Sequence, residues 1–461
     1  MTWILPEGAS LTFEGLAEPV HIRRGLGSGS QGQVMEVEVA GERLALKWYF
    51  PACISRDPHL ERRLGEAIRA TAPSASFLWP IALLRPTPAT QARLRSRHSG
   101  FGYLMGLRPP DFAGAVEHVA GRLELSLRSA LLACLHLADA FHALHSKGLC
   151  YKDISLGNLF LEPGSGRILI CDNDNVDVDG RDLGSVLGTP GFMAPEILLG
   201  RARPGAASDL HALAVLIFRL LTRSDPFRGR LELAIRCLDE PARRRLYGED
   251  PVFIFDPLDH RNRPDPEQHA AALVTWPIYP AELQALFVQS FGPGLKDPAR
   301  RALTGQWQQA LAQTLDQRQL CPDCGQENFR CAAGATAAGT GTARGPQACW
   351  HCGAALPPPL RLQLPRGEVV AAAGTTLHRH HFDVLHPPQG DAPLAELVAH
   401  PSDPTVLGLR NLGEGPWRAV LERGGELEIA PGRSVNVAAL AQVRTPLGPI
   451  TPQRRCPPSP M

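Results

Sequence analysis

The sequence predicts an α+β fold of two lobes, followed by a small cysteine-containing module and an all-β C-terminal domain. Residues 9–50 read as strands broken by glycine, because apolar and polar residues alternate there. Residues 125–145 instead place apolar residues at helical spacing, which indicates a long buried helix. Two Cys-x-x-Cys pairs follow, and residues 360–452 return to alternation with Gly, Pro and Asn turns.

Length and composition limit the classes of protein to consider. The 461 residues suggest about three domains. A net charge of +1 gives no reason to expect binding to nucleic acid or to an anionic membrane. No apolar run approaches the roughly 20 residues of a spanning helix, and the N-terminus has no secretory pattern. Eleven Cys, an odd number, then favour a reducing cytoplasm over a disulfide framework.

A glycine-rich run opens the first lobe. Gly27, Gly29, Gly32 and Val34 fit the pattern G-x-G-x-x-G-x-V, in which glycines let the backbone approach phosphates. Residues 34–39 alternate, which indicates a strand where a dinucleotide-binding fingerprint requires a helix. The run is therefore a strand–loop–strand flap over a nucleotide or, alternatively, an ordinary flexible hairpin tip.

Charged and amide side chains at three further places suit phosphoryl transfer. Lys47 stands alone in the apolar run 43–49, either as a phosphate ligand or as a strand-end Lys whose amine reaches water. Asp153 would orient a hydroxyl nucleophile and accept its proton. Asn158 and Asp172 would hold the divalent metals that bridge the phosphates, although an acidic turn beside a strand is the simpler alternative.

Taken in order, these motifs resemble the protein kinase family, in particular bacterial eukaryotic-like serine/threonine kinases. The resemblance covers about residues 10–316 and implies a bilobal protein kinase fold over 1–316, with an N-lobe at about 10–105 and a C-lobe at about 109–316. It rests on the glycine run and on four further stretches, which match V-A-I-K, H-R-D-x-x-x-x-N, D-F-G and G-T-x-x-Y/F-x-A-P-E: Arg43–Lys47, Tyr151–Asn158, Asp172–Asp174 and Gly188–Glu196.

The resemblance implies the reaction and its catalytic residues. The γ-phosphoryl group of ATP would pass to Ser or Thr hydroxyls of protein substrates, with Mg²⁺ or Mn²⁺ as cofactor. Small-molecule phosphotransferases usually lack the segment ending at Glu196, which favours a protein substrate. Glu66, 19 residues beyond Lys47 on an expected helix over 60–70, would pair with Lys47, and Glu61 is the alternative. Thr189 would contact Asp153 and shape the hydroxyl site.

The same resemblance implies the contacts of the adenine ring. Val34 would lie under the ring, and Met105 would sit at the back of the pocket. The backbones of Gly106 and Arg108 would bind the edge of the base.

Two further contacts are expected to support the site. Glu196 would form an ion pair with Arg301, which is costly to break from one side when buried. Asp209, at the start of a helix, would bind the backbone of the loop that carries Asp153.

Several positions depart from the family pattern. Lys152 replaces an Arg and cannot bind a loop phosphate through two parallel hydrogen bonds, which puts activation by phosphorylation in doubt. Ser155 stands in place of a Lys, and Asn173 and Asp174 replace Phe and Gly. We interpret Asp174 as capping a turn, with added metal affinity as the alternative. These changes motivate a second hypothesis, a nucleotide-binding pseudokinase scaffold.

The cysteine pairs predict a zinc ribbon over 317–356. Two C-x-x-C-G knuckles with 24 residues between them suit one tetrahedral structural Zn²⁺, held by Cys321, Cys324, Cys349 and Cys352. Cys331 and His351 are possible substitute ligands, and a redox role for each pair is the other alternative. The absence of a basic cluster favours protein contacts.

The last part of the chain predicts an all-β sandwich or barrel over 360–452 and a disordered tail over 453–461. The β module vaguely resembles forkhead-associated domains. His378, His380 and His381 form either a metal site or, in our interpretation, a surface cluster. We expect these modules to recruit substrates or a regulator, which gives protein substrates and a cognate phosphatase or adaptor as partners.

Overall fold

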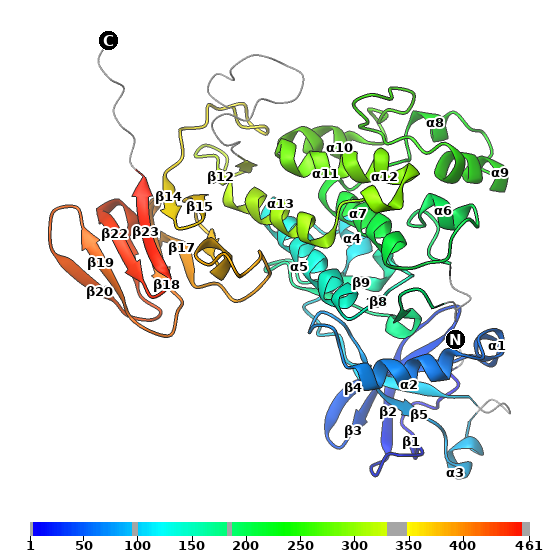
Figure 1. Ribbon diagram of the computed structural model, residues 1–461. Coiled ribbons are helices and arrows are strands. Elements are labelled where there is room, and N and C mark those ends of the chain that lie inside the picture. The colour runs from blue at the N-terminus through cyan, green and yellow to red at the C-terminus, as the bar shows by residue number, and fades with distance from the viewer. Residues whose placement is uncertain (1–2, 95–99, 182–186, 330–347, 454–461) are drawn as a thin grey trace.

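The computed structural model of the chain describes residues 3–94, 100–181, 187–329 and 348–453. Figure 1 shows a sheet-rich N-terminal lobe in blue, a helical C-terminal lobe in cyan and green, and a β module in orange and red beside the second lobe. The predicted disordered tail lies outside the described residues, except for Gln453, which ends the last strand.

An antiparallel sheet with the strand order β1-β2-β3-β4-β6-β5 forms the first lobe. Its central strand β4 is buried on both faces, because Leu44, Leu46 and Trp48 pack into one apolar cluster and the alternate residues Ala45 and Tyr49 into another. Helix α2 covers the second face through two of its leucines. The elements are β1 (Ser10–Leu11), β2 (Val20–Ser28), β3 (Gly32–Val39), β4 (Glu42–Tyr49), α1 (Pro51–Arg56), α2 (Leu60–Ala70), β5 (Pro80–Leu84), α3 (Pro88–Gln91) and β6 (Gly102–Gly106).

Helices build the second lobe around α5. Helix α5 is long and apolar enough to cross a bilayer, but its apolar side chains belong to the core of this lobe. Ser126 caps its first turn by accepting a hydrogen bond from the backbone of Ser129. The helices are α4 (Ala115–Val119), α5 (Leu127–Ser146), α6 (Pro195–Leu198), α7 (Ala206–Thr222), α8 (Arg230–Leu233), α9 (Glu240–Arg244), α10 (Ala270–Thr275), α11 (Ala281–Phe291), α12 (Pro293–Lys296) and α13 (Thr304–Asp316).

Short strands between the first lobe and the helices of the second lobe carry the loops of the candidate site (Figure 1). They pair as two small antiparallel sheets with the orders β10-β9-β7 and β11-β8. These strands are β7 (Ala113–Gly114), β8 (Leu149–Cys150), β9 (Leu159–Leu161), β10 (Ile168–Ile170) and β11 (Asp177–Val178).

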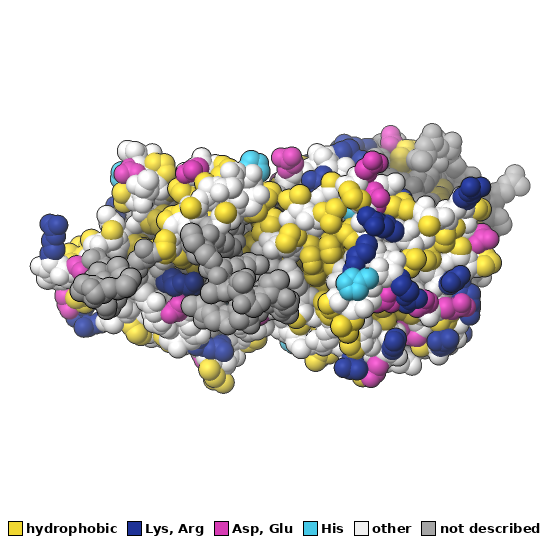
Figure 2. All heavy atoms as spheres, turned by 90° about the horizontal axis from the view of Figure 1, so that it is seen from above, with side chains coloured by type: hydrophobic (Ala, Val, Ile, Leu, Met, Phe, Trp, Pro, Cys, Tyr) yellow, Lys and Arg dark blue, Asp and Glu magenta, His cyan; other side chains and the backbone are white. Residues whose placement is uncertain are grey.

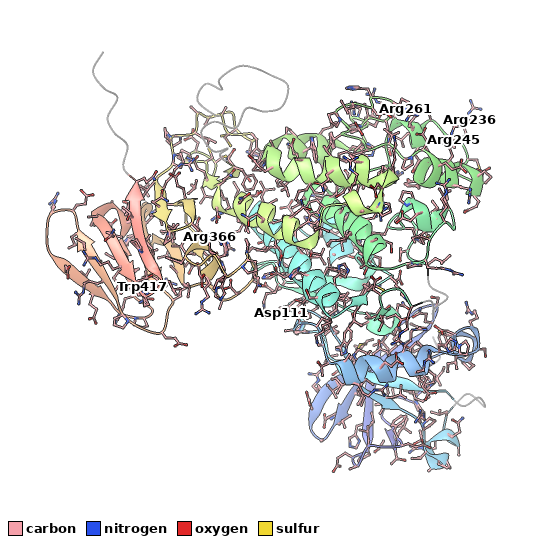
Figure 3. All side chains as sticks on the ribbon, viewed as in Figure 1. Asp111, Arg236, Arg245, Arg261, Arg366 and Trp417 are labelled. Carbon is pink, nitrogen blue, oxygen red and sulfur yellow. The ribbon has the colours of Figure 1, made fainter. Side chains whose placement is uncertain are left out.

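Aromatic packing organises the stretch 231–290, for which the sequence alone suggested no assignment. Phe255 stacks on Trp276 with 4.7 Å between ring centroids, and both rings contact Phe218 of α7. Three of the exposed arginines of this stretch lie at its outer end (Figure 3): Arg236, Arg245 and Arg261.

The C-terminal part begins with a hairpin of β12 (Arg318–Leu320) and β13 (Glu327–Phe329). Two sheets follow, with the orders β15-β14-β23-β22-β19-β20 and β16-β17-β18-β21, and they share one apolar core that includes Trp417 (Figure 3). The strands are β14 (Arg361–Leu364), β15 (Gly367–Val370), β16 (Thr376–Leu377), β17 (Ala395–His400), β18 (Asp403–Asn411), β19 (Trp417–Leu421), β20 (Glu426–Ile429), β21 (Ser434–Asn436), β22 (Leu440–Thr445) and β23 (Gly448–Gln453).

The β module docks on the helices of the second lobe. Arg128 of α5 donates from Nε to the carbonyl oxygen of Gly374 at 2.9 Å, and Arg318 donates to that of Ala373. On the face seen from above in Figure 2, Lys and Arg side chains are interspersed with acidic and apolar ones.

Candidate active site

Helix α7 holds the loop that carries Asp153. Asp209 accepts the backbone N–H of Tyr151 at 2.6 Å and that of Lys152 at 2.9 Å, which confirms the predicted contact. Tyr151 is buried and donates its hydroxyl to the carbonyl oxygen of Cys171, so the loop and the end of β10 are tied together. Lys152 and Asp172 both adopt positive φ angles, 71° and 55°, and such strain in non-glycine residues concentrates at functional sites.

Asp153 is oriented by two neighbours. Thr189 donates its hydroxyl to Asp153 Oδ1 at 2.6 Å, and this is the contact that the sequence predicts. Asn158 donates its amide to the carbonyl oxygen of Asp153 at 3.0 Å. The side-chain oxygen of Asn158 is therefore the atom that a cation would meet.

Asp172 lies at the end of β10, next to this loop. The backbone N–H of Cys171 binds the carbonyl oxygen of Asn158 at 2.9 Å, which sets the two predicted metal ligands on adjoining segments. The Asp172 side chain is 38% exposed, so a cation can reach it. Burial of the rest of the carboxyl raises its pKa, and Lys47 opposes this shift. Carboxylate and amide oxygens are the ligand types that Mg²⁺ takes, so the residues fit the metal.

Lys47 lies at the centre of a buried polar cluster. Its Nζ donates to Asp174 Oδ2 at 2.8 Å, to Gln31 Oε1 at 3.0 Å and to Asp172 Oδ1 at 3.2 Å. Burial works to lower the pKa of Lys47, but Asp174 and Asp172 outweigh it and raise that pKa above its ordinary value. Lys47 is therefore a fixed cation beside the loop of Asp153.

A buried ion pair fixes the segment that ends at Glu196. The guanidinium of Arg301 binds the two carboxylate oxygens of Glu196 through two hydrogen bonds of 2.7 Å each. Two more of its five donors reach the carbonyl oxygens of Ala207 and Gly294, so four of the five have partners on this side chain with 0% exposure. The predicted Glu196–Arg301 pair is confirmed.

Comparison with known proteins agrees with this geometry. Residues 115–250 match the family described as "Protein kinase domain", and the match includes Asp153, Asn158, Asp172 and Thr189. The chain contains a protein kinase domain.

Individual relatives are named as protein kinases, one of them as a serine/threonine kinase. Over 120 residues the chain is 30% identical to "Serine/threonine-protein kinase 40" of Homo sapiens, which covers 25% of this chain and 28% of that protein. It is 35% identical over 120 residues to "CBL-interacting protein kinase 25" of rice, a match that covers 25% of this chain and 21% of that protein. It is 34% identical over 158 residues to "Protein kinase C-like" of Neurospora crassa, and this match covers 33% of this chain and 13% of that protein. The chain thus spans less than a third of the length of these relatives.

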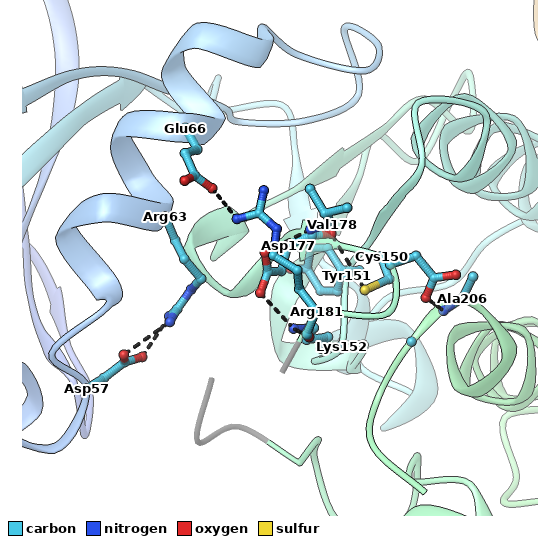
Figure 4. Close-up of polar contacts among 12 residues, drawn as sticks. Asp57, Arg63, Glu66, Cys150, Tyr151, Lys152, Asp177, Val178, Arg181 and Ala206 are labelled. Atoms are coloured by element: carbon cyan, nitrogen blue, oxygen red, sulfur yellow. Dashed lines mark hydrogen bonds and ion pairs between the residues drawn. The ribbon is translucent and has the colours of Figure 1, made fainter. Parts of the chain in front are cut away.

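The structure corrects the predicted partner of Lys47. Glu66 Oε2 accepts a hydrogen bond from Arg181 Nη1 at 2.7 Å (Figure 4), and its other oxygen lies 3.9 Å from Arg62 Nε. Among the described residues Lys47 pairs with Asp172 and Asp174 and not with Glu66. The reason is competition for Lys47: Asp174 reaches its amine from the turn after β10, while α2 directs Glu66 toward the segment after β11. Glu61, the alternative, binds Arg85.

The glycine run forms the tip of the β2–β3 hairpin. A Cβ on Gly32 would meet the carbonyl oxygen of Trp48 at 2.2 Å, so this close approach requires glycine. Gly27 and Gly29 have open space where a Cβ would lie, which leaves room above the sheet. Gln31 binds Lys47 and places the tip over that cation.

The predicted adenine contacts lie around the passage between the lobes. Val34 and Met105 pack in the apolar cluster under the sheet, and Gly106 ends β6. The Arg108 guanidinium lies 4.5 Å from the Phe160 ring centroid and donates to the Phe112 carbonyl oxygen. This anchors the linking segment, and the roles of these residues toward adenine stay predictions.

The departures from the family pattern have structural partners. Lys152 donates to Asp177 Oδ2 at 3.1 Å (Figure 4). The amide of Asn173 donates to the carbonyl oxygens of Leu78 and Ile170. Asp174 is buried against Lys47 and Tyr49, so its interpretation as a turn cap is wrong. One signal was available: Lys47 and Tyr49 are two residues apart on a strand and share a face, which offers a buried acid two donors.

The four predicted zinc ligands come together. One sulfur atom from each of Cys321, Cys324, Cys349 and Cys352 lies within 4.8 Å of the others. Gly325 and Gly353 take φ values of 73° and 75° and close the two knuckles.

The chemistry of this cluster suits zinc. Against the effect of burial, hydrogen bonds from the backbones of Cys352 and His351 and from Asn328 lower the pKa of Cys349 to about 6. By contrast, backbone hydrogen bonds are outweighed by burial and contacts with other thiols at Cys324 and Cys352, and the pKa of each is raised. Four thiols at this spacing fit a tetrahedral Zn²⁺. His351 does not belong to the group, and Cys331 lies outside the described residues.

The histidines at 378–381 are not a surface cluster, because His380 and His381 are buried where the β module meets α13. His381 Nε2 lies 3.0 Å from Asp316 Oδ1, and a ring nitrogen of His380 is close to both. His381 Nδ1 accepts the backbone N–H of His378, so its proton is on Nε2 and is donated to Asp316. A metal-bound His normally donates its other N–H, so this geometry indicates a docking hydrogen bond. Arg366 (Figure 3) binds the carbonyl oxygen of His380 and supports the same turn.

Proposed function

We propose that this chain is a serine/threonine protein kinase that transfers the γ-phosphoryl group of ATP to hydroxyl groups of protein substrates. The observation that carries the proposal is the Asp153–Thr189 contact of 2.6 Å, with Asn158 bonded to the same residue and Asp172 beside it. A carboxylate that is oriented by a hydroxyl donor and flanked by two oxygen ligands is the arrangement that phosphoryl transfer needs.

In this reaction Asp153 accepts the proton of the substrate hydroxyl as its oxygen attacks the γ-phosphorus. The bond between the γ-phosphorus and the bridging oxygen breaks, and ADP leaves. Lys47 binds the phosphates from the side of the glycine loop. Mg²⁺ held by Asn158 and Asp172 would supply the charge that neutralises the phosphate oxygens.

The C-terminal modules support a recruiting or regulatory role. The cysteine cluster suits a structural Zn²⁺ ribbon, and the two sheets of 361–453 offer a surface for a substrate, a cognate phosphatase or an adaptor. The cysteines that the structure describes form no disulfide bond, which supports a reducing cytoplasm. The motif variants and composition support a bacterial signalling kinase.

The zinc assignment is tested by metal analysis of the purified full chain. We expect about one Zn²⁺ per chain and its loss in the Cys321→Ser, Cys349→Ser double variant. Cys237→Ser, at an exposed thiol outside the cluster, is the matched control and should keep the metal. Zinc-free wild-type protein with an intact fold would contradict the assignment.

Phosphoryl transfer is tested with labelled ATP and Mg²⁺, using the phosphatase-treated chain and a lysate as acceptors. The wild type should label Ser or Thr, and Asp153→Asn should lose about 10²–10⁴-fold in rate, as for other positioned proton acceptors. Asp111→Asn, at an exposed carboxylate paired with Arg167, is the matched control and should keep its rate. Nucleotide binding by the wild type without any transfer would instead support the pseudokinase scaffold.

A further inference from the structure

We infer that Asp174 is the residue that positions Lys47, in the place where the sequence suggests Glu66. This inference rests on the proposed kinase function, because Lys47 is the side chain that would bind the ATP phosphates. It assigns a role to an acid that stands where the family pattern has glycine.

Asp174 and Lys47 form a buried, hydrogen-bonded ion pair. Asp174 Oδ2 accepts hydrogen bonds from Lys47 Nζ at 2.8 Å and from the hydroxyl of Tyr49. The side chains of Asp174 and Lys47 are only 1% and 5% exposed. Asp174 Oδ1 is buried too, and it has no hydrogen-bond partner among the described residues. Removing Lys47 would thus leave a carboxylate buried without that counter-charge, bound to the neutral hydroxyl of Tyr49, which is strongly unfavourable.

Asn173 fixes the backbone that presents Asp174. Its amide donates to the carbonyl oxygen of Leu78 at 2.8 Å, just before β5, and to that of Ile170 at 3.0 Å. It thereby joins the first lobe to the end of β10. The short 3-10 helix Asn173–Asn175 then directs the side chain of Asp174 toward Lys47 on β4. The two departures from the D-F-G pattern therefore act together.

Glu66 is engaged elsewhere. Its partner Arg181 follows β11, and the two side chains are 33% and 39% exposed (Figure 4). Arg63, one turn earlier on α2, is held by Asp57 (Figure 4). Glu66 and Arg181 line a cavity of about 370 Å³ between α2 and β11. Glu66 therefore links α2 to the segment after β11, whereas the ion pairs of Lys47 are with Asp172 and Asp174.

Metal binding would sharpen this division of roles. Asp172 contacts Lys47 at 3.2 Å and is also the predicted Mg²⁺ ligand. When the cation takes Asp172, Asp174 remains as the carboxylate that holds Lys47 toward the phosphates. The anchoring of Lys47 then depends on the segment 172–174 and not on the position of α2.

The test compares Asp174→Asn with Glu66→Gln, two isosteric neutralisations, in the full chain. We expect Asp174→Asn to lower kcat/KM for ATP about 100-fold or more, and Glu66→Gln to stay within about threefold of the wild type. A second readout is the dissociation constant of a fluorescent ATP analogue, measured without phosphoryl transfer. It should rise about tenfold or more in Asp174→Asn, because Lys47 is no longer held toward the phosphates, and should stay within about threefold of the wild type in Glu66→Gln.

Nucleotide affinity separates this inference from the proposed function, since its measurement needs no phosphoryl transfer. Absence of transfer in the wild type, together with the expected loss of affinity in Asp174→Asn, would overturn only the kinase proposal. A 100-fold loss of kcat/KM in Glu66→Gln, or an unchanged nucleotide affinity in folded Asp174→Asn, would overturn the role of Asp174. Glu66 is partly exposed, so its variant decides the question even where Asp174→Asn fails to fold.

Discussion

Two ion pairs near the candidate site, Lys47–Asp174 and Glu66–Arg181, differ in burial and in what they hold. Lys47–Asp174 is almost completely buried, and each partner is fixed by further hydrogen bonds or charges. Glu66–Arg181 is about one-third exposed at both ends. A buried pair is costly to break, whereas an exposed pair contributes little and is screened by salt. The comparison teaches that the nucleotide site is held rigidly, while the contact of α2 with the segment after β11 is adjustable.

The largest effect is expected from breaking the buried pair at its cation. Lys47→Met leaves Asp174 buried without its cation, so we expect a loss of about 3–5 kcal/mol in the stability of the kinase domain together with the loss of transfer. Thermal and urea unfolding measure the first effect, and labelled ATP the second. Lys296→Met, at an exposed lysine that ends α12, should leave both unchanged. A Lys47→Met variant as stable as the wild type would show that the Lys47–Asp174 pair does not stabilise the fold.

A third ion pair is buried like the first but holds the same segment as the second. Lys152–Asp177 is buried, with 7% and 2% exposure, but it holds the same segment as Arg181. Because Asp177 supplies the negative charge from within the chain, we expect phosphatase treatment to leave the wild-type rate within about threefold. Asp177→Asn should lower the rate about tenfold and destabilise the domain by about 1–3 kcal/mol. A rate that falls to background after dephosphorylation would show that a phosphate is required.

The pH range over which the buried pair stabilises the fold follows from the two pKa shifts. Burial alone would raise the pKa of Asp174, but Lys47 lowers it below its ordinary value. The stabilisation by Asp174 is therefore complete above the unfolded pKa of about 3.9, and it is lost only as the pH falls through the lower pKa of the folded state. The pKa of Lys47 is raised, so the upper limit lies above its unfolded value of about 10.4. The stability difference between the wild type and Asp174→Asn should therefore be flat from about pH 5 to 9. A difference that vanishes near pH 6 would contradict the assigned shifts.

The smallest effect is expected at the exposed pair. Arg181→Ala should change stability by at most about 1 kcal/mol, and that change should shrink in high salt. The effect of Asp174→Asn should persist in the same salt, because the buried pair is little screened. Urea unfolding at low and high ionic strength makes the comparison, and a salt-independent loss in Arg181→Ala would show that its pair is more buried in solution.

Sequence reasoning reached the contacts that are fixed by position along the backbone. Asp153–Thr189, Asp209 under the loop and Glu196–Arg301 each join motifs whose order and spacing are visible in the chain. The competition between Glu66 and Asp174 for Lys47 was not visible, because it depends on how α2 is turned on the sheet. The docking hydrogen bond between His381 and Asp316 was equally hidden, since it joins residues 65 positions apart in two parts of the chain.

A crystal structure of the full chain with Mg²⁺ and a non-hydrolysable ATP analogue tests the assignment of Lys47 most directly. We expect Lys47 Nζ to lie about 3 Å from both a phosphate oxygen and Asp174, with Asp172 on the metal and Glu66 still paired with Arg181. An α2 shifted inward, with Glu66 bound to Lys47, Asp174 released and Arg181 free of its partner, would contradict it.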